Sequence, residues 1–119
     1  MSPTRPRLVN RRNGAVLAEQ VERAVSMRAR LRGLLGRTAL PEGCALAIEP
    51  CTSVHTFFMR FTIDVAFVAP DGRVLRAISD LRPWRATRVY PAAALVVELP
   101  AGTLRRTQTQ DGDGLDFVV

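Results

Sequence analysis

Lysine is absent from this sequence, and histidine and tryptophan each occur only once. The 17 basic residues are therefore all arginines, which face 11 acids and give a net charge of +6. Residues 1–37 hold nine arginines and two acids, whereas residues 38–119 hold eight arginines and nine acids. Guanidinium groups suit carboxylate and phosphate partners. A basic region alone is weak evidence for nucleic-acid binding, so we interpret the charge first as a compositional and solubility feature.

Cysteines and long apolar segments are also scarce. Two cysteines, Cys44 and Cys51, are too few for a disulfide framework. We expect both to be thiols in a reducing cytosol, and a bridge between them stays open for an exported protein. The first 20 residues lack the apolar core of a secretory signal, and no apolar run is long enough to cross a bilayer. We therefore expect a cytoplasmic protein with no membrane partner.

Several motifs that carry known chemistry are missing as well. The sequence contains no phosphate-binding glycine loop, no His-Glu-x-x-His and no Cys-x-x-Cys. The acidic turn at 111–116 lacks the terminal glutamate of a calcium-binding loop. We expect no cofactor and no resident metal ion.

The chain of 119 residues has the length of one domain with its own core. Residues 1–13 mix proline, arginine and asparagine without periodicity and are expected to form a flexible basic arm, and residues 14–119 a single β-rich domain. One strand is expected over about 15–24. One helix is expected after Ser26, a suitable N-cap, and Gly36 suits the left-handed position at its end.

Beyond this helix the pattern changes to the period of two that is typical of strands. Apolar, β-branched and aromatic residues predict strands over 44–48, 54–68 with a bend near 60–62, 74–77, 94–99 and 115–118. Thr103 is expected to cap one short helical turn. The expected fold is mainly β: a compact single-domain β-barrel or sandwich of about six to eight short strands with one α-helix.

A hairpin is indicated around Pro70-Asp71-Gly72, because a three-residue loop places its glycine at the left-handed position. The predicted register sets Phe67 opposite Leu75. It also brings Arg76 diagonal to Asp64 on the other face of the hairpin.

Five sequence blocks together resemble one protein family. They lie at 30–37, 59–67, 71–74, 97–102 and 112–113, and the likeness extends over about 15–118. The set is similar to domain of unknown function 192, whose usual pattern is Trp-Met-Lys followed by Pro-Leu-Asp. Here Phe58 and Arg60 replace the Trp and the Lys, and Thr62-Ile63 replaces Pro-Leu before Asp64. The resemblance implies a compact β-rich domain and no known reaction.

Cys51, His55 and Met59 raise the question of a soft-metal site. Thiolate, imidazole and thioether together suit an ion such as Cu(I). On a strand, however, residues four apart are separated by about 13 Å, which is too far for a shared ion. We therefore favour core positions for these residues, unless a bend brings them together.

A nucleophilic enzyme is the main alternative to a binding protein. His55, the only histidine, would be the base for Cys51 or Cys44, and Asp64 would orient it. No oxyanion loop or nucleophile elbow is visible, and we favour a non-catalytic His55.

Asp64 stands within an apolar run and therefore needs partners. The candidates are Arg60, Arg76 and Arg32, or several backbone N–H groups. We favour a structural ion pair or turn cap over a ligand contact.

Trp84 lies beside Arg85 in a proline-containing loop, where it has the chemistry to stack on a ligand or to cover an end of the domain. Our leading hypothesis is a non-enzymatic binding or accessory module for an anionic small molecule or an acidic protein. The expected ligand-binding residues are His55, Met59, Arg60, Asp64, Trp84 and Arg85. The alternatives are a small hydrolase or transferase that uses Cys51, His55 and Asp64, and nucleic-acid binding through the arginine-rich N-terminal third, which we rank last.

Overall fold

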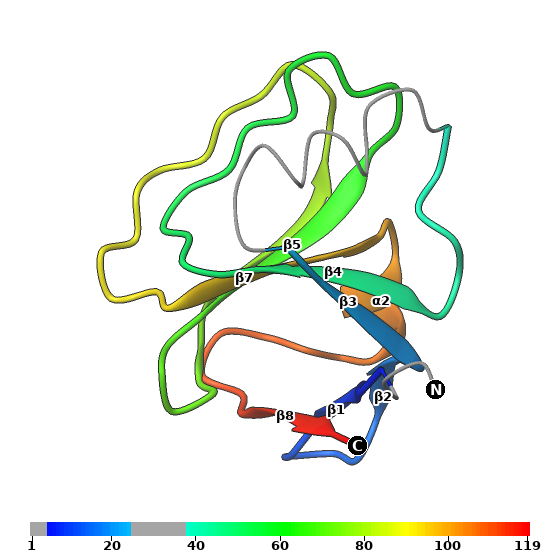
Figure 1. Cartoon of the computed structure of the whole chain (residues 1–119), viewed down its shortest axis with the longest axis vertical. Helices are drawn as coiled ribbons and strands as arrows, with labels where there is room; N and C mark the ends of the chain where they lie inside the picture. The colour runs from blue at the N-terminus through cyan, green and yellow to red at the C-terminus, as the bar shows by residue number, and fades with distance from the viewer. Residues whose placement is uncertain (1–4, 25–37) are drawn as a thin grey trace.

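Two β-sheets organise the chain in a computed structural model, which describes residues 5–24 and 38–119 (Figure 1). The small sheet has the strand order β2-β1-β8 and the large sheet the order β3-β4-β7-β5-β6. Only β3 and β4 pair in parallel among these strands. The elements are β1 (Arg7–Asn10), β2 (Val16–Ala18), β3 (Gln20–Ala24), β4 (Cys44–Ile48), β5 (Ile63–Val68), β6 (Val74–Leu81), β7 (Leu95–Pro100), α2 (Thr103–Arg106) and β8 (Leu115–Val118).

The predicted mainly β fold is confirmed, and of the two expected architectures the structure shows a sandwich. Neither sheet closes on itself over the described residues, so the domain is not a barrel. Among these residues, no helix has the length and apolar character needed to cross a membrane.

The large sheet is covered on both faces, because successive residues of a strand point to opposite sides. One face packs with the small sheet around a first core that includes Leu8, Val97 and Leu99. The other face packs against loops around a second core that includes Ile48 and Phe67. This two-sided burial explains why β5 and β7 are apolar on both faces apart from Asp64 and Glu98.

The N-terminal part of the chain differs from the prediction in two ways. Residues 7–10, expected within a flexible arm, form β1, which pairs with both β2 and β8. Its four residues are too few to show periodicity in the sequence, yet Leu8 and Asn10 are completely buried. The strand expected over 15–24 is divided at Glu19, where the chain leaves the small sheet for the large one. The expected helix after Ser26 lies outside the described residues.

The prediction of a strand over 54–62 is wrong. The strand β5 begins only at Ile63, and residues 50–62 form a loop that contacts a second loop at 82–94. Phe58 has a φ of 68°, which is incompatible with extended backbone. The composition of this segment is typical of a strand because it is rich in apolar and β-branched residues. Its apolar side chains, such as Val54 and Met59, pack in the second core from a loop instead.

The hairpin between β5 and β6 is confirmed, but its register is shifted by one residue. Gly72 has a φ of +91°, and its N–H donates to the carbonyl of Ala69 at 2.9 Å. Phe67 lies opposite Arg76 and not Leu75, because the pairing is irregular between Phe67 and Val68. On its other side β6 contacts residues 111–113: Val74 exchanges backbone hydrogen bonds with Gly112 and Asp113, and the Ala77 N–H donates to the Asp111 carboxylate.

Candidate functional site

Two loops, at 50–62 and 82–94, are joined around the buried side chain of Thr56. The backbone N–H of Thr56 donates to the Arg85 carbonyl at 2.8 Å, and the Trp84 N–H donates to the Thr56 carbonyl at 3.0 Å. The Thr56 hydroxyl donates to the carbonyl of Arg82 at 2.5 Å and accepts the N–H of Arg85 at 2.9 Å. A single buried polar residue thus fixes one loop against the other.

Further hydrogen bonds extend this contact along both loops. The Thr87 N–H donates to the carbonyl of Val54 at 2.9 Å, and the Val54 N–H donates to the Thr87 hydroxyl at 3.0 Å. The Tyr90 N–H donates to the Thr52 carbonyl at 2.8 Å. These bonds make the two loops a continuous ladder although neither contains a strand.

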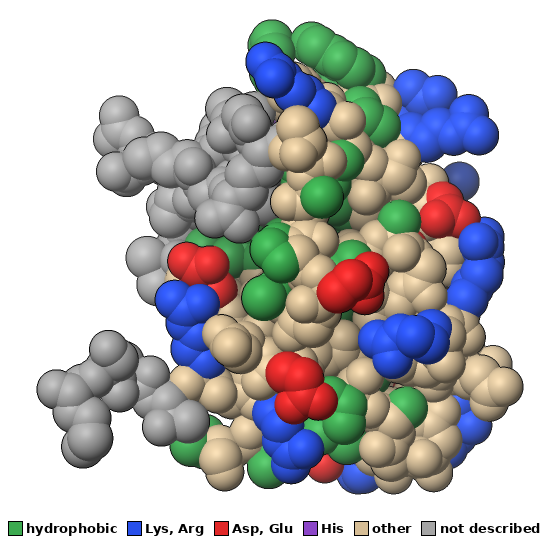
Figure 2. Space-filling view, turned by 90° about the vertical axis from the view of Figure 1, so that its right-hand side faces the viewer, with side chains coloured by type: hydrophobic (Ala, Val, Ile, Leu, Met, Phe, Trp, Pro, Cys, Tyr) green, Lys and Arg blue, Asp and Glu red, His purple; other side chains and the backbone are tan. Residues whose placement is uncertain are grey.

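Four rings gather where the two loops meet, and we call His55, Phe57, Phe58 and Trp84 the aromatic end. The ring centroids of His55 and Phe57 are 4.8 Å apart, and those of Phe58 and Trp84 are 4.7 Å apart. The Phe57 and Trp84 centroids are 6.1 Å apart, so the rings form one connected cluster. The exposed fraction is 38% for Phe57, 66% for Phe58 and 56% for Trp84. The loops lie at the upper end of the molecule in Figure 1, where Figure 2 shows hydrophobic and arginine side chains together.

The two most exposed rings of this cluster stand on strained backbone. Phe58 has a φ of 68° and Trp84 a φ of 63°, in the left-handed region that bulky residues rarely adopt. Such a conformation costs a non-glycine residue about 1–2 kcal/mol. Glycine would adopt these backbone conformations without strain, so exposed aromatic rings at these two positions lower the stability of the fold. Their presence therefore points to a role in binding.

The surroundings of the aromatic end are positive. Arg60, Arg82, Arg85 and Arg88 are all exposed, and the segments 50–62 and 82–94 contain no acid. Within the described part of the chain, none of these four guanidinium groups forms an ion pair. Their charge is therefore available to a partner.

Three of the five described N-terminal arginines contrast with these four. Arg11 pairs with Asp116 at 2.9 Å, Arg12 with Asp113 at 2.7 Å, and Arg23 with Glu49 at 3.4 Å. These ion pairs neutralise much of the basic character that the sequence places in this part of the chain. The expected helix arginines Arg28, Arg30, Arg32 and Arg37 lie outside the described residues.

The structure brings some of the expected site residues together at the aromatic end and places others behind it. His55, Trp84 and Arg85 meet there, since His55 forms a β-bridge with Ala86. Met59 is only 4% exposed and packs in the second core. Cys51 is also buried in this core, and its thiol donates to the carbonyl of Ser53 at 3.0 Å. Among the described residues, no cluster of histidine, cysteine and acidic side chains is arranged to hold a metal ion.

Asp64 caps α2, a helix that begins about 40 residues later in the chain. Its Oδ2 accepts the backbone N–H of Leu104 at 2.9 Å, in the first turn of α2, and its Oδ1 accepts the N–H of Asp80 at 2.9 Å. Thr103, the expected cap, donates its hydroxyl to the carbonyl of Pro100 instead. A carboxylate that receives two backbone N–H bonds satisfies its buried charge without a guanidinium. Asp64 is completely buried, so it faces the core and not the aromatic end.

Arg76 pairs with Asp111 at 3.3 Å, so the expected ion pair between Asp64 and Arg76 is not formed. The shifted hairpin register explains this, because it places Arg76 opposite Phe67. The third expected member, Arg32, lies outside the described residues.

The residues of the alternative catalytic set do not converge. Cys51 belongs to the second core, whereas Asp64 points to the face of the first core, as do Ala66 and Val68 on the same strand. Cys51 and Asp64 therefore lie on opposite sides of the large sheet. Cys44 and Cys51 are both thiols.

Sequence reasoning missed a buried polar cluster that joins the two ends of the described chain. The Asn10 amide donates to Thr109 at 3.1 Å and to Asp113 at 3.0 Å. Asp113 also accepts two hydrogen bonds from Arg12. The hydrogen bond from Arg12 is the main cause that lowers the pKa of Asp113 to about 2. Asn10 and Asp113 are about 100 residues apart in the chain, so no local sequence pattern indicates this polar cluster.

No local pattern marks Phe57 and Phe58 as exposed, because their composition is typical of a strand. Glu98 is a further buried polar residue: it is completely buried in β7 and points toward the second core. An acid inside an apolar run is the signal that would have identified it.

A model of the family DUF192, described as "Uncharacterized ACR", matches residues 8–117. The chain belongs to the DUF192 family. A UPF0127 protein of Thermococcus sibiricus is 28% identical over 94% of this chain and 75% of the relative. A UPF0127 protein of Pyrococcus abyssi is 33% identical over 56% of each chain.

Two solved structures share the fold of this DUF192 member. A Sinorhizobium meliloti protein, described as a candidate transcription regulator, has a TM-score of 0.77 with 23% identity and covers 98% of both chains. A Novosphingobium aromaticivorans protein of unknown function has a TM-score of 0.80 with 21% identity, over 94% of this chain and 84% of the other. At such identities the likeness shows the fold alone.

Proposed function

We propose that this DUF192 protein is a non-enzymatic binding module that docks on an acidic protein through its aromatic end. One observation carries the proposal: Phe58 and Trp84 are exposed and stand at positive φ, where they do not serve stability. Tryptophan and arginine are also among the residues that contribute most to protein interfaces.

Charge complementarity identifies the chemistry of the partner. Arg60, Arg82, Arg85 and Arg88, which form no ion pair with any described residue, favour a surface that carries carboxylates. His55, Arg60, Trp84 and Arg85 keep their expected binding roles in this proposal. Met59 and Asp64 act behind the surface, where Met59 supports the loop from the second core and Asp64 fixes β5 to α2.

The arrangement of the rings favours a protein over a single-stranded nucleic acid. Base stacking needs open ring faces, yet Trp84 already contacts both Phe57 and Phe58. The cluster therefore presents one connected and exposed apolar surface, which fits an apolar pocket with an acidic rim. A cytoplasmic partner is part of the proposal, because two thiols suit a reducing compartment.

A photo-activatable phenylalanine analogue at position 57 provides the test. Phe57 stacks between His55 and Trp84 and is 38% exposed, and the analogue keeps an aromatic ring at this position, so Phe58 and Trp84 stay in place. Irradiation in the native cell is expected to link the protein to a specific partner, and the same analogue at Arg73, on the hairpin, serves as the control site. The captured partner is then purified and titrated by calorimetry with the unmodified chain.

Trp84→Ala is expected to weaken this affinity by about thirtyfold or more, which corresponds to the loss of a hot-spot residue. Val89→Ala is the matched control, since Val89 is 63% exposed in the same loop and lies outside the ring cluster. Affinity should also fall as salt is raised. An unchanged affinity for Trp84→Ala would contradict the proposal, and so would an adduct that nuclease treatment removes.

A further inference from the structure

The backbone of residues 84–89 forms the outer border of the two joined loops. Figure 1 shows this segment, in yellow, outside the green loop at 50–62, to which its backbone is hydrogen-bonded. The exposed residues of the segment are Trp84, Arg85, Ala86, Arg88 and Val89. The side that faces away from residues 50–62 is therefore open to solvent.

The backbone of Ala86 points toward this open side. Ala86 forms an isolated antiparallel β-bridge with His55. The hydrogen bonds on either side of the bridge are made by the neighbours of these two residues, which is the pattern of a non-hydrogen-bonded pair. The N–H and C=O of Ala86 are therefore turned away from His55. Among the described residues, neither of these groups nor the N–H of Arg88 has a hydrogen-bond partner.

Three open backbone groups, two on Ala86 and one on Arg88, thus form an edge like that of a strand. Residues two apart on a strand direct their backbone groups to the same side, so one added strand can bind both. An exposed edge of this kind accepts an extended peptide, whose backbone supplies hydrogen bonds and whose alternate side chains supply specificity. The outer side of β6, by contrast, already contacts residues 111–113.

The side chains beside this edge favour an acidic strand. Arg85 and Arg88 lie on either side of Ala86, both are exposed, and neither forms an ion pair with a described residue. The segment 82–94 contains no acid. Carboxylates on an added strand would therefore meet these two guanidinium groups without competition from a neighbouring acid of this chain.

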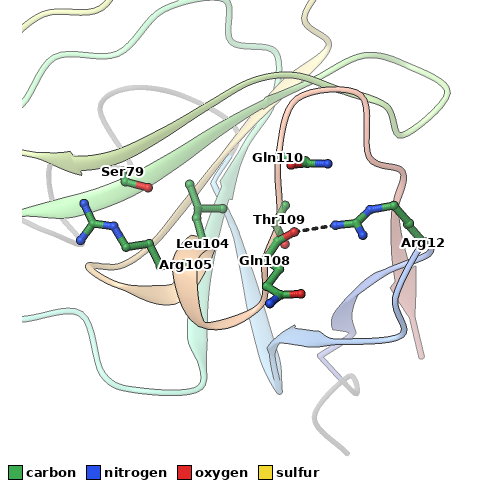
Figure 3. A pocket seen from close by; sticks show the side chains of 7 residues that line it. All are labelled: Arg12, Ser79, Leu104, Arg105, Gln108, Thr109 and Gln110. Carbon is green, nitrogen blue, oxygen red and sulfur yellow. Dashed lines mark hydrogen bonds between the residues drawn. The ribbon is translucent and has the colours of Figure 1, made fainter.

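Other arginines are already engaged, as those of the hollow beside α2 illustrate. Figure 3 shows Arg12 and Arg105 there, with Arg12 donating to the Gln108 carbonyl. Arg12 also pairs with Asp113 at 2.7 Å, and Arg105 pairs with Asp80 at 2.6 Å. Their charge is neutralised within the chain, whereas the charge beside the open edge is not.

The aromatic rings lie on one face of the same edge. Directly opposed residues of a strand pair share a face, so Ala86 lies on the side of the His55 ring. The centroid of that ring is 4.8 Å from the ring of Phe57, whose centroid is 6.1 Å from that of Trp84. An added strand would place every second side chain on this face.

We propose that the acidic partner of the aromatic end contributes one extended strand, which pairs antiparallel with residues 84–88. This inference rests on the docking function proposed for the aromatic end and specifies how the partner is bound. The central residue of the strand exchanges both backbone hydrogen bonds with Ala86. The residue two before it is acidic and contacts Arg88, and the residue after it is acidic and contacts Arg85. The residue two after it is apolar and packs on Trp84.

A peptide of sequence Asp-Thr-Val-Glu-Leu, acetylated at one end and amidated at the other, tests this mode of binding. Its central valine pairs with Ala86, which directs the aspartate to Arg88, the glutamate to Arg85 and the leucine to Trp84. Trp84 is the only tryptophan of the chain, so its fluorescence follows a titration of the full chain. Saturable binding is expected, together with shifts of the backbone amide resonances at 84–89.

Two N-methylated peptides separate backbone pairing from attraction by charge. A methyl group on the valine nitrogen removes the N–H that donates to the Ala86 carbonyl, and it should weaken binding by about tenfold or more. The threonine nitrogen points away from the protein in this antiparallel pair, so the same methyl group there should change the affinity by less than about twofold. Both peptides keep the charge and the side chains of the parent.

A double-mutant cycle tests the register. Arg88→Gln should reduce the affinity for the parent peptide by about fivefold, and it should have little effect on a peptide in which asparagine replaces the aspartate. Arg73→Gln removes the same charge from an exposed residue of the hairpin and should leave the affinity unchanged.

The results distinguish strand addition from docking by charge and apolar contact. Equal affinities of the two N-methylated peptides would overturn strand addition, and so would the absence of saturable binding up to about 5 mM. Equal losses for Arg88→Gln and Arg73→Gln would indicate attraction by net charge only, and would overturn it as well. The docking function itself is judged separately, by the affinity of the captured partner for the Trp84→Ala variant.

Discussion

Trp84 and Phe58 show how single residues can be placed against the preference of their own backbone. Glycine adopts positive φ without steric cost, whereas any residue with a Cβ meets the following carbonyl. The contribution of the backbone can be separated from that of the ring by comparing two small replacements at one position.

Trp84→Gly is expected to be more stable than Trp84→Ala by about 1 kcal/mol, because both lack the ring and only alanine keeps the strain at a φ of 63°. Val89, an exposed residue of the same loop that is absent from the positive-φ residues, should show the reverse order. Urea unfolding of the four variants measures both differences. An alanine variant more stable than the glycine variant at position 84 would show that the backbone there is not strained.

Asp64→Asn is expected to lower the free energy of unfolding by about 3 kcal/mol. An asparagine has one acceptor oxygen, so one of the N–H groups of Asp80 and Leu104 would face an amide N–H₂ group. Asp116→Asn, which removes half of an exposed ion pair, should cost less than about 1 kcal/mol. Denaturant unfolding distinguishes the two, and similar losses for both would mean that Asp64 is no more than a surface charge in energetic terms.

The need of Asp64 for partners could be predicted from its apolar neighbours, but the partners could not. The two N–H groups that it binds lie 16 and 40 residues away in the chain. The same limit applies to residues 51–59. Their composition is typical of a strand, and the positive φ of Phe58 leaves no mark in the sequence because no glycine stands there.

At the scale of the secondary-structure elements, a close backbone contact at Gly72 positions the β5–β6 hairpin against β8. A Cβ added at Gly72 would lie 2.7 Å from the carbonyl oxygen of Leu115. The hairpin and the last strand therefore meet backbone to backbone, and the Leu115 N–H donates to the Gly72 carbonyl at 2.8 Å.

Gly72→Ala is expected to lower the free energy of unfolding by about 3 kcal/mol, since it combines unfavourable φ with a clash against backbone. Gly112→Ala is a matched control, because Gly112 has nearly the same φ, +92°, and an added Cβ would meet nothing within 4 Å. That variant should lose about 1 kcal/mol. Thermal unfolding compares them, and equal losses would contradict the close approach at Gly72.

Elements with longer apolar or alternating patterns were predicted well, as the strands β4 and β7 show. The short β1 was not, because its burial depends on two partner strands distant in sequence. The hairpin loop was predicted from Gly72, whereas its register was not. The irregular pairing between Phe67 and Val68 leaves no mark in the alternation of apolar residues.

At the scale of the whole molecule, the carboxylate of Asp113 joins Asn10, at the end of β1, and Arg12, just after it, to the turn before β8. The pKa of this buried carboxyl is lowered from 3.8 to about 2, and Arg12 is the main cause. The folded state therefore holds this proton less tightly than the unfolded state does. The resulting stabilisation is complete above about pH 5 and is lost as the pH falls through 3.8 toward 2.

Asp113→Asn should remove at most about 2 kcal/mol at pH 7, since water around the partly exposed Arg12 screens the pair. The difference in unfolding free energy between the unmodified chain and this variant should shrink between pH 5 and pH 2. Denaturant unfolding at several pH values measures it. Two curves that stay parallel over this range would exclude Asp113 as the group responsible.

Pairing of Arg7 with Val118 has a practical consequence for how the molecule is presented. The first and last described strands lie side by side at the lower end of Figure 1, and the two loops with the aromatic rings lie at the upper end. A tether attached to either strand, whether a resin, a sensor surface or a fused protein, therefore leaves from the same pole. The opposite pole stays open to solution in every copy, so immobilised molecules would share one orientation with their aromatic rings outward.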